Sequence, residues 1–347
     1  MKEFLEDDEK KLLLDLFHIY APTNGEAPLS LFLAKFLEKE GIEFTIDEHN
    51  NIYSMKFPGE PILCSHQDCV GDAACGSLVE FIDIYDFDGE KILKGNGNIG
   101  ADDKVGIFLI LLYLTKVNKN INFVFSTGEE RSVPTGIKTI VANIKETEGF
   151  KQAPYCIVLD RKNGGDIICY ENSYGSKKFD EALEEIGEKY WFKSVKGGHS
   201  DTAIFADYMN AANLSVGYYN PHSKTEYVII SEMLNTFDYV CDIIENLDRT
   251  IPFEPKKTYG GSYGGSYGGS YGGYGGSYNS HLDDYDYDYY DGYGNGYNYN
   301  KKKEVKDTNT ETAQATGGAA ATAATKPEVK RDSGYYYTND YDELYND

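Results

Sequence analysis

The sequence has no long apolar segment. Its longest apolar run, Val105 to Leu114, is far shorter than the roughly 18 residues that a membrane-spanning helix needs. Met1 to Lys11 is charged and contains no apolar stretch after a positive region, so we expect no signal peptide. Both absences predict a protein without a membrane partner.

Paired cysteines and clustered basic residues are also missing. The six cysteines form no CxxC motif, and Cys64 and Cys156 lie in apolar runs, where buried free thiols are expected. Free thiols are typical of a reducing compartment, which predicts a cytoplasmic protein. The net charge of −24 and the absence of a basic stripe argue against nucleic acid as a partner. The excess of acid instead suits a site that collects cations.

Composition changes sharply near Lys257. Residues 1–256 have the apolar runs and helical periodicity of a globular domain, whereas residues 257–347 are dominated by Gly, Tyr, Asp and Ala. Repeats of Tyr-Gly-Gly-Ser cannot bury enough apolar surface to offset the entropy of ordering the chain. We therefore predict one domain at 1–256 and a disordered tail at 257–347. The tail is either a solvated tether or a segment for weak self-association, and its partner is unknown.

Four short apolar runs are each followed by side chains that can bind a metal ion. These runs are typical of strands and lie at 61–65, 122–126, 155–159 and 214–219. Helical periodicity between and beyond them predicts helices at 104–116, 135–145, 177–189, 202–210 and 231–247. This alternation predicts an α/β fold, with a mixed and mostly parallel sheet covered by helices on both faces. Ligands of such sheets bind beyond the carboxyl ends of the strands, where residues remote in sequence converge.

The residues at these strand ends match what a pair of divalent ions requires. Two ions about 3.5–4 Å apart need a bridging carboxylate and further nitrogen or oxygen ligands. A separate base must also take a proton from water. Glu129 is the candidate base. The candidate metal ligands are His66, Asp102, Glu130, Asp160 and His222.

The order of the motifs resembles the co-catalytic zinc peptidases, the family that includes tripeptidase (peptidase T) and the metallo-aminopeptidases. The resemblance extends over residues 1 to about 250. Each motif alone is of limited specificity, but their order and spacing together are specific. The motifs are His66-Gln67-Asp68, Gly100 to Gly106, Thr127-Gly128-Glu129-Glu130, Asp160, and Asn220-Pro221-His222-Ser223 with Glu226.

The resemblance implies a zinc-peptidase-like sandwich and a role for each matching residue. Asp102 would bridge the ions and precede a cis peptide bond, Glu129 would be the general base, and Asp68 would orient His66. The implied cofactors are two divalent ions, most often Zn²⁺, with Co²⁺ or Mn²⁺ as alternatives. The implied activity is hydrolysis of short peptides by an aminopeptidase-like or tripeptidase-like exopeptidase.

Two departures from the family pattern stand out. Many relatives insert a lid or dimerisation domain before the last histidine, but only about sixty residues separate Asp160 from His222, so we predict no lid. A lid can supply the donor that stabilises the oxyanion, and here His199 or Tyr218 would have to replace it. Gln67 and Cys69 also stand where relatives often have an apolar residue and Thr, although neither change removes a ligand.

Simpler interpretations exist for several of these residues. Asp102 or Asp103 could cap the helix that begins near Lys104, and Asp160 could form a surface ion pair with Arg161. Residues 197–201 (Gly-Gly-His-Ser-Asp) fit either a substrate loop or a helix-capping turn. At the level of function, an N-acyl amino acid or other amide deacylase would use the same site. A non-catalytic binding or structural protein could also retain the fold.

Overall fold

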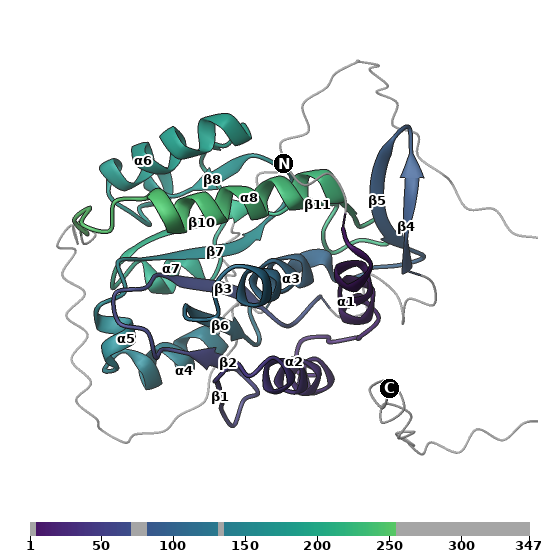
Figure 1. Ribbon diagram of the computed structural model, residues 1–347, viewed down its shortest axis with the longest axis horizontal. Helices are drawn as coiled ribbons and strands as arrows, with labels where there is room; N and C mark the ends of the chain where they lie inside the picture. The colour runs from purple at the N-terminus through teal and green to yellow at the C-terminus, as the bar shows by residue number, and fades with distance from the viewer. Residues whose placement is uncertain (1–4, 71–81, 131–134, 255–347) are drawn as a thin grey trace, which may run out of the picture. The chain divides into compact units, whose positions relative to one another are not determined.

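The computed structural model describes residues 5–70, 82–130 and 135–254, and the predicted tail at 257–347 lies outside them. The described residues form a large sheet and a small one (Figure 1). In spatial order the large sheet consists of β1 (Thr45–Ile46), β2 (Ile52–Ser54), β6 (Asn122–Ser126), β3 (Ile62–His66), β7 (Tyr155–Arg161), β10 (Asn210–Ser215), β8 (Asp166–Ile168) and β9 (Lys193–Ser194).

The four central strands of the large sheet are parallel. β3 pairs with β6 on one side and with β7 on the other, and β7 continues to β10. Every residue of β3 and β6 is buried, which explains why these strands are continuous apolar runs and not alternating patterns. The register places His66 opposite Ser126, so both strands end at the same edge. The predicted mixed, mostly parallel sheet is confirmed.

Helices cover both faces of this sheet (Figure 1). Leu63 and Phe123 point to one face, and the adjacent Cys64 and Val124 point to the other. The first face packs against α1 (Asp7–Phe17), α2 (Ala27–Lys39), α3 (Ala101–Lys116), α6 (Lys177–Gly187) and α8 (Ile230–Asn246). The second packs against α4 (Thr135–Ile144), α5 (Glu148–Lys151) and α7 (Thr202–Phe205).

Two other sequence predictions can be compared with the described residues. No helix among them has the length and apolar character needed to cross a bilayer. The five cysteines that the structure describes are free, and four of them are buried. Two of these four are Cys64 and Cys156, whose apolar runs predicted burial.

The small sheet was not predicted. It is antiparallel, with the order β11 (Tyr218–Tyr219), β12 (Tyr227–Ile229), β5 (Glu90–Gly95) and β4 (Ile82–Phe87). The predicted strand at 214–219 was wrong, because β10 ends at Ser215 and Gly217, at φ +88°, leads the chain into β11 of the other sheet. The predicted helix at 202–210 is shorter, because residues 210–212 pair with β7.

The segment between Asp160 and His222 belongs to the core. It supplies β8, β9 and β10 to the large sheet and β11 to the small one, with α6 and α7 packed against the large sheet. All of residues 161–221 are described and none forms a separate lid. The prediction that no lid domain lies between Asp160 and His222 is confirmed.

Gly106 allows α3 to approach the end of β7 very closely. A Cβ atom at this position would lie 2.0 Å from the backbone oxygen of Leu159 and 2.6 Å from Asp103 Oδ1. We expect Gly106→Ala to lower the free energy of unfolding by about 1–3 kcal/mol, as overpacking does. Urea unfolding followed by circular dichroism measures this. Gly198→Ala is the control, since nothing lies within 4 Å of its added Cβ, and an equal loss in both variants would contradict the explanation.

Candidate metal centre

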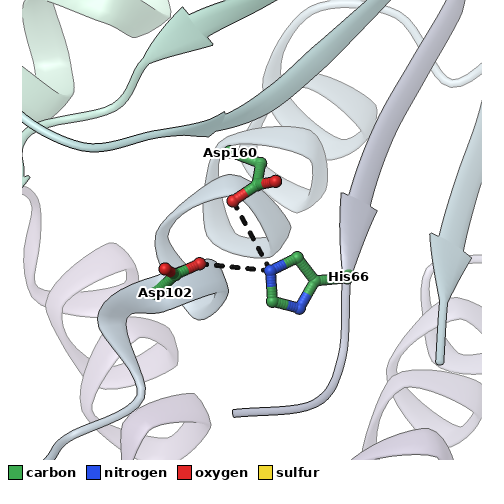
Figure 2. A group of neighbouring side chains, drawn as sticks. All are labelled: His66, Asp102 and Asp160. Atoms are coloured by element: carbon green, nitrogen blue, oxygen red, sulfur yellow. Dashed lines mark hydrogen bonds and ion pairs between the residues drawn. The ribbon is translucent and has the colours of Figure 1, made fainter. Parts of the chain in front are cut away.

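Asp102 lies between two histidines, and each of its carboxylate oxygens faces a different ring. Oδ1 is 3.1 Å from His66 Nε2, and Oδ2 is 3.2 Å from His222 Nε2. Asp160 Oδ1 lies 3.5 Å from the same nitrogen of His66 (Figure 2), and Glu130 Oε1 lies 2.8 Å from His222 Nε2. Two groups of potential ligands therefore share Asp102. They are His66, Asp102 and Asp160, and Asp102, Glu130 and His222.

The backbone around Asp102 turns its side chain away from the helix that follows. Gly100 has φ +64°, the Asp102–Asp103 peptide bond is cis, and both aspartates have non-helical torsion angles. Asp103 instead caps the regular part of α3, which follows these two non-helical residues, because its carboxylate accepts a hydrogen bond from Gly106 N at 3.2 Å. The same carboxylate accepts a hydrogen bond from Ser65 Oγ of β3 at 2.5 Å. The helix-capping alternative thus applies to Asp103, and Asp102 faces the histidines.

Asp68 connects three parts of the site with one carboxylate. Its Oδ1 lies 3.5 Å from His66 Nδ1 and accepts a hydrogen bond from Glu129 N at 2.9 Å. Its Oδ2 accepts a hydrogen bond from Glu130 N at 3.2 Å. Burial alone would raise the pKa of Asp68, but its interactions with His66 hold that pKa below the usual range. That Asp68 orients His66 remains a prediction, whereas its hydrogen bonds hold the backbone of the Glu-Glu segment.

Asp160 faces the site and not the surface. Its side chain is 7% exposed, and Arg161 forms its ion pair with Asp166 at 3.2 Å. Asn213 Oδ1 accepts a hydrogen bond from Asp160 N at 3.0 Å, and the hydroxyl of Tyr218 donates to Asp160 O at 3.3 Å. The alternative of a surface ion pair between Asp160 and Arg161 is wrong.

Glu226 ties the loop of His222 to the segment of Asp102. Its buried side chain accepts a hydrogen bond from Asp102 N at 3.2 Å, although the two residues lie 124 positions apart. Burial, together with the charge of Asp102, raises the pKa of Glu226 to about 7. The sequence indicated this acid only through the resemblance, and nothing in its local pattern predicted the contact.

The acids of the site are held close together in a poorly solvated space. Burial, with the charge of Asp160 as the next cause, raises the pKa of Glu129 to about 10. Burial also raises the pKa of Asp160 to about 7. Burial would lower the pKa of His222, but hydrogen bonds with Asp102 and Glu130 raise it to about 11. Carboxylate oxygens and imidazole nitrogens are the ligand atoms that Zn²⁺ and similar ions prefer, so the residues of this cluster fit such ions.

Residues 197–201 include the turn before α7, and their role as a substrate loop remains a prediction. Ser200 Oγ accepts a hydrogen bond from Thr202 N at 3.3 Å and so caps α7. The carboxylate of Asp201 instead accepts a hydrogen bond from the hydroxyl of Ser126, at the end of β6. His199 Nδ1 lies 3.0 Å from the hydroxyl of Tyr174, and His199 is exposed. That His199 or Tyr218 stabilises the oxyanion remains a prediction.

Comparison with known proteins supports the resemblance. No protein-family model matches the chain. A protein of Pyrococcus abyssi described as a putative [LysW]-lysine/[LysW]-ornithine hydrolase is 23% identical over 269 residues, which are 74% of this chain and 68% of that protein. Other curated relatives of this description match over less than half of their own length.

Solved structures show the same fold. Aminopeptidase PepT of Bacillus cereus is 16% identical, with a TM-score of 0.53. A tripeptidase of Staphylococcus aureus is 14% identical, with a TM-score of 0.54. Each match covers 70% of this chain and 99% of the other. The chain therefore has the zinc-peptidase-like fold that the sequence resemblance implied.

Proposed function

We propose that this chain, which has the zinc-peptidase-like fold, is a metal-dependent hydrolase that cleaves peptide bonds as an exopeptidase. The proposal depends on the position of Asp102. One of its carboxylate oxygens faces His66 and the other faces His222, and these histidines belong to different groups of potential ligands. A carboxylate placed in this way is what a bridged pair of ions requires. The proposed ligands are His66, Asp102, Glu130, Asp160 and His222.

Each residue has a defined task in the proposed reaction. When bound, divalent ions supply Lewis acidity, which makes water more acidic and polarises the scissile carbonyl group. Glu129 takes a proton from the attacking water on its carboxylate and delivers it to the leaving nitrogen as the carbon–nitrogen bond breaks. Asp68 holds the backbone of Glu129 and faces His66. The products are a carboxylic acid and an amine.

A comparison of free and N-blocked peptides tests the proposal. The purified full chain, supplied with Zn²⁺, Co²⁺ or Mn²⁺, is assayed with Leu-Gly, Leu-Gly-Gly and their N-acetyl forms. An exopeptidase that recognises the free amine should prefer the free peptides on the order of 100-fold, because a lost charged hydrogen bond costs about 1.5–3 kcal/mol. Chromatography of the released amino acids gives kcat/KM. A chain that binds metal and cleaves none of these peptides would contradict a peptidase.

A second candidate is release of an amino acid from a larger amide conjugate. It is favoured by the relative from Pyrococcus abyssi, whose description names lysine and ornithine conjugates. The same water and the same base would attack this amide, so the site itself does not separate the two reactions. Nα-acyl-lysine and Nα-acyl-ornithine belong in the same assay. Cleavage of these alone would identify a deacylase.

A further inference from the structure

Thr23 lies outside the proposed ligand set and yet contacts the residue that organises it. Its hydroxyl donates a hydrogen bond to Asp68 Oδ2 at 2.8 Å, across 45 residues of sequence. The same oxygen of Asp68 accepts from Glu130 N, and the other accepts from Glu129 N and faces His66. Asp68 holds the backbone of Glu129 and Glu130, and the hydroxyl of Thr23, from the connection between α1 and α2, is a further donor to the same carboxylate.

The backbone around Thr23 is fixed independently of its hydroxyl. Thr23 N donates to Cys69 O at 3.2 Å, and Cys69 N donates to Ala21 O at 2.9 Å. Pro22 and Cys69 form an isolated parallel bridge. The hydroxyl of Thr23 also lies 3.5 Å from Cys69 O, a longer contact than the one to Asp68. Removing the hydroxyl alone should thus leave this segment in place beside Asp68.

We propose that Thr23 is a positioning residue, whose hydroxyl holds Asp68 in the orientation that aligns Glu129 and Glu130 with the two histidines. The inference rests on the proposed function, because it assigns Thr23 to the same metal site. Asp68 is fully buried and must satisfy its acceptors within the protein. Without the hydroxyl, the carboxylate loses one of its donors and can rotate away from the backbone of Glu129 and Glu130. Outer partners of this kind typically contribute 10–100-fold to metal affinity or activity.

The test compares Thr23→Val, which has nearly the same shape and no hydroxyl, with Thr23→Ser, which keeps the hydroxyl. Zn²⁺ affinity is measured on the full chain by competition with a chromogenic chelator, and kcat and KM are measured on the best peptide substrate. We expect Thr23→Val to lower the affinity and kcat each about 10-fold with KM unchanged, and Thr23→Ser to restore both. Thr115→Val is the matched control, since its hydroxyl bonds only to carbonyls within α3.

A double-mutant cycle separates action through Asp68 from a general structural effect. In an Asp68→Ala background, Thr23→Val should change Zn²⁺ affinity less than about twofold. An equal loss in both backgrounds would overturn the inference, as would a Thr23→Val variant that binds Zn²⁺ and turns over like the wild type. If Asp68→Ala does not fold, the comparison of Thr23→Val with Thr23→Ser in Zn²⁺ affinity and kcat tests the inference alone. A wild-type chain that binds no metal would refute the proposed function itself, which is a different outcome.

Discussion

Glu129→Gln is expected to lower kcat by about 10²–10⁴-fold while both metal ions stay bound, because the amide cannot accept a proton from water. The structure gives a reason for separating Glu129 from its neighbour. Glu130 is 2.8 Å from His222, whereas Glu129 belongs to neither group of potential ligands. The measurement pairs steady-state kinetics with metal analysis of the purified variant.

Glu130→Gln is the matched control for this prediction. The adjacent residue undergoes the same chemical change, but it loses a proposed ligand and should reduce the bound metal. If Glu129→Gln loses metal and Glu130→Gln keeps it, the two assignments are reversed. If Glu129→Gln turns over every cleavable substrate at the wild-type rate, Glu129 is not the base.

Asp102→Asn is expected to weaken the binding of both ions by more than about 100-fold, beyond what loss of an outer partner causes. Asp102 is common to the two groups of ligands, so asparagine removes the negative charge from both. It also replaces one of the two oxygens, which face different histidines, with an amide nitrogen that cannot bind a cation. Zinc at 100 times its dissociation constant should stabilise the wild type by about 2.7 kcal/mol, and this gain should vanish in the variant. Thermal unfolding with and without Zn²⁺ measures it.

Asp86→Asn provides the comparison for Asp102→Asn. Asp86 is an exposed acid on β4 that pairs with Lys91 at 2.8 Å, and such surface pairs contribute little. This variant should retain the whole stabilisation by Zn²⁺. If Asp102→Asn retains it as well, Asp102 does not bridge two ions. A wild type that gains nothing from Zn²⁺, Co²⁺ or Mn²⁺ would instead favour a binding or structural protein that keeps the fold.

The large sheet could be predicted because its strands are buried on both faces. The predicted apolar runs at 61–65 and 122–126 have few alternatives to a central parallel strand, and they correspond to β3 and β6. β10 was harder to predict, since it begins Asn-Ala-Ala and its strand conformation depends on pairing with β7 and β8. The small sheet was missed for a related reason. Its strand β4 is largely exposed and carries no strong apolar pattern.

Some parts of the candidate site could likewise be predicted from the sequence, and others could not. His66 and Asp160, which lie at the ends of β3 and β7, were found because parallel strands end at one edge. The contact of Thr23 with Asp68 left no local signal, because it joins a turn to a strand end 45 residues away. The sequence also left open whether Asp102 or Asp103 caps α3, and the backbone conformation assigns the cap to Asp103.

The sequence by itself determined that His66 and Asp160 reach the edge of the sheet, since burial of the apolar runs sets where β3 and β7 end. Only the tertiary structure decided how those side chains are held. The hydrogen bonds from Thr23 to Asp68 and from Asp102 N to Glu226, and the turn of Asp102 away from α3, depend on segments that meet only after the core has packed. Such polar contacts are set by distance in space, and no periodicity along the chain encodes them.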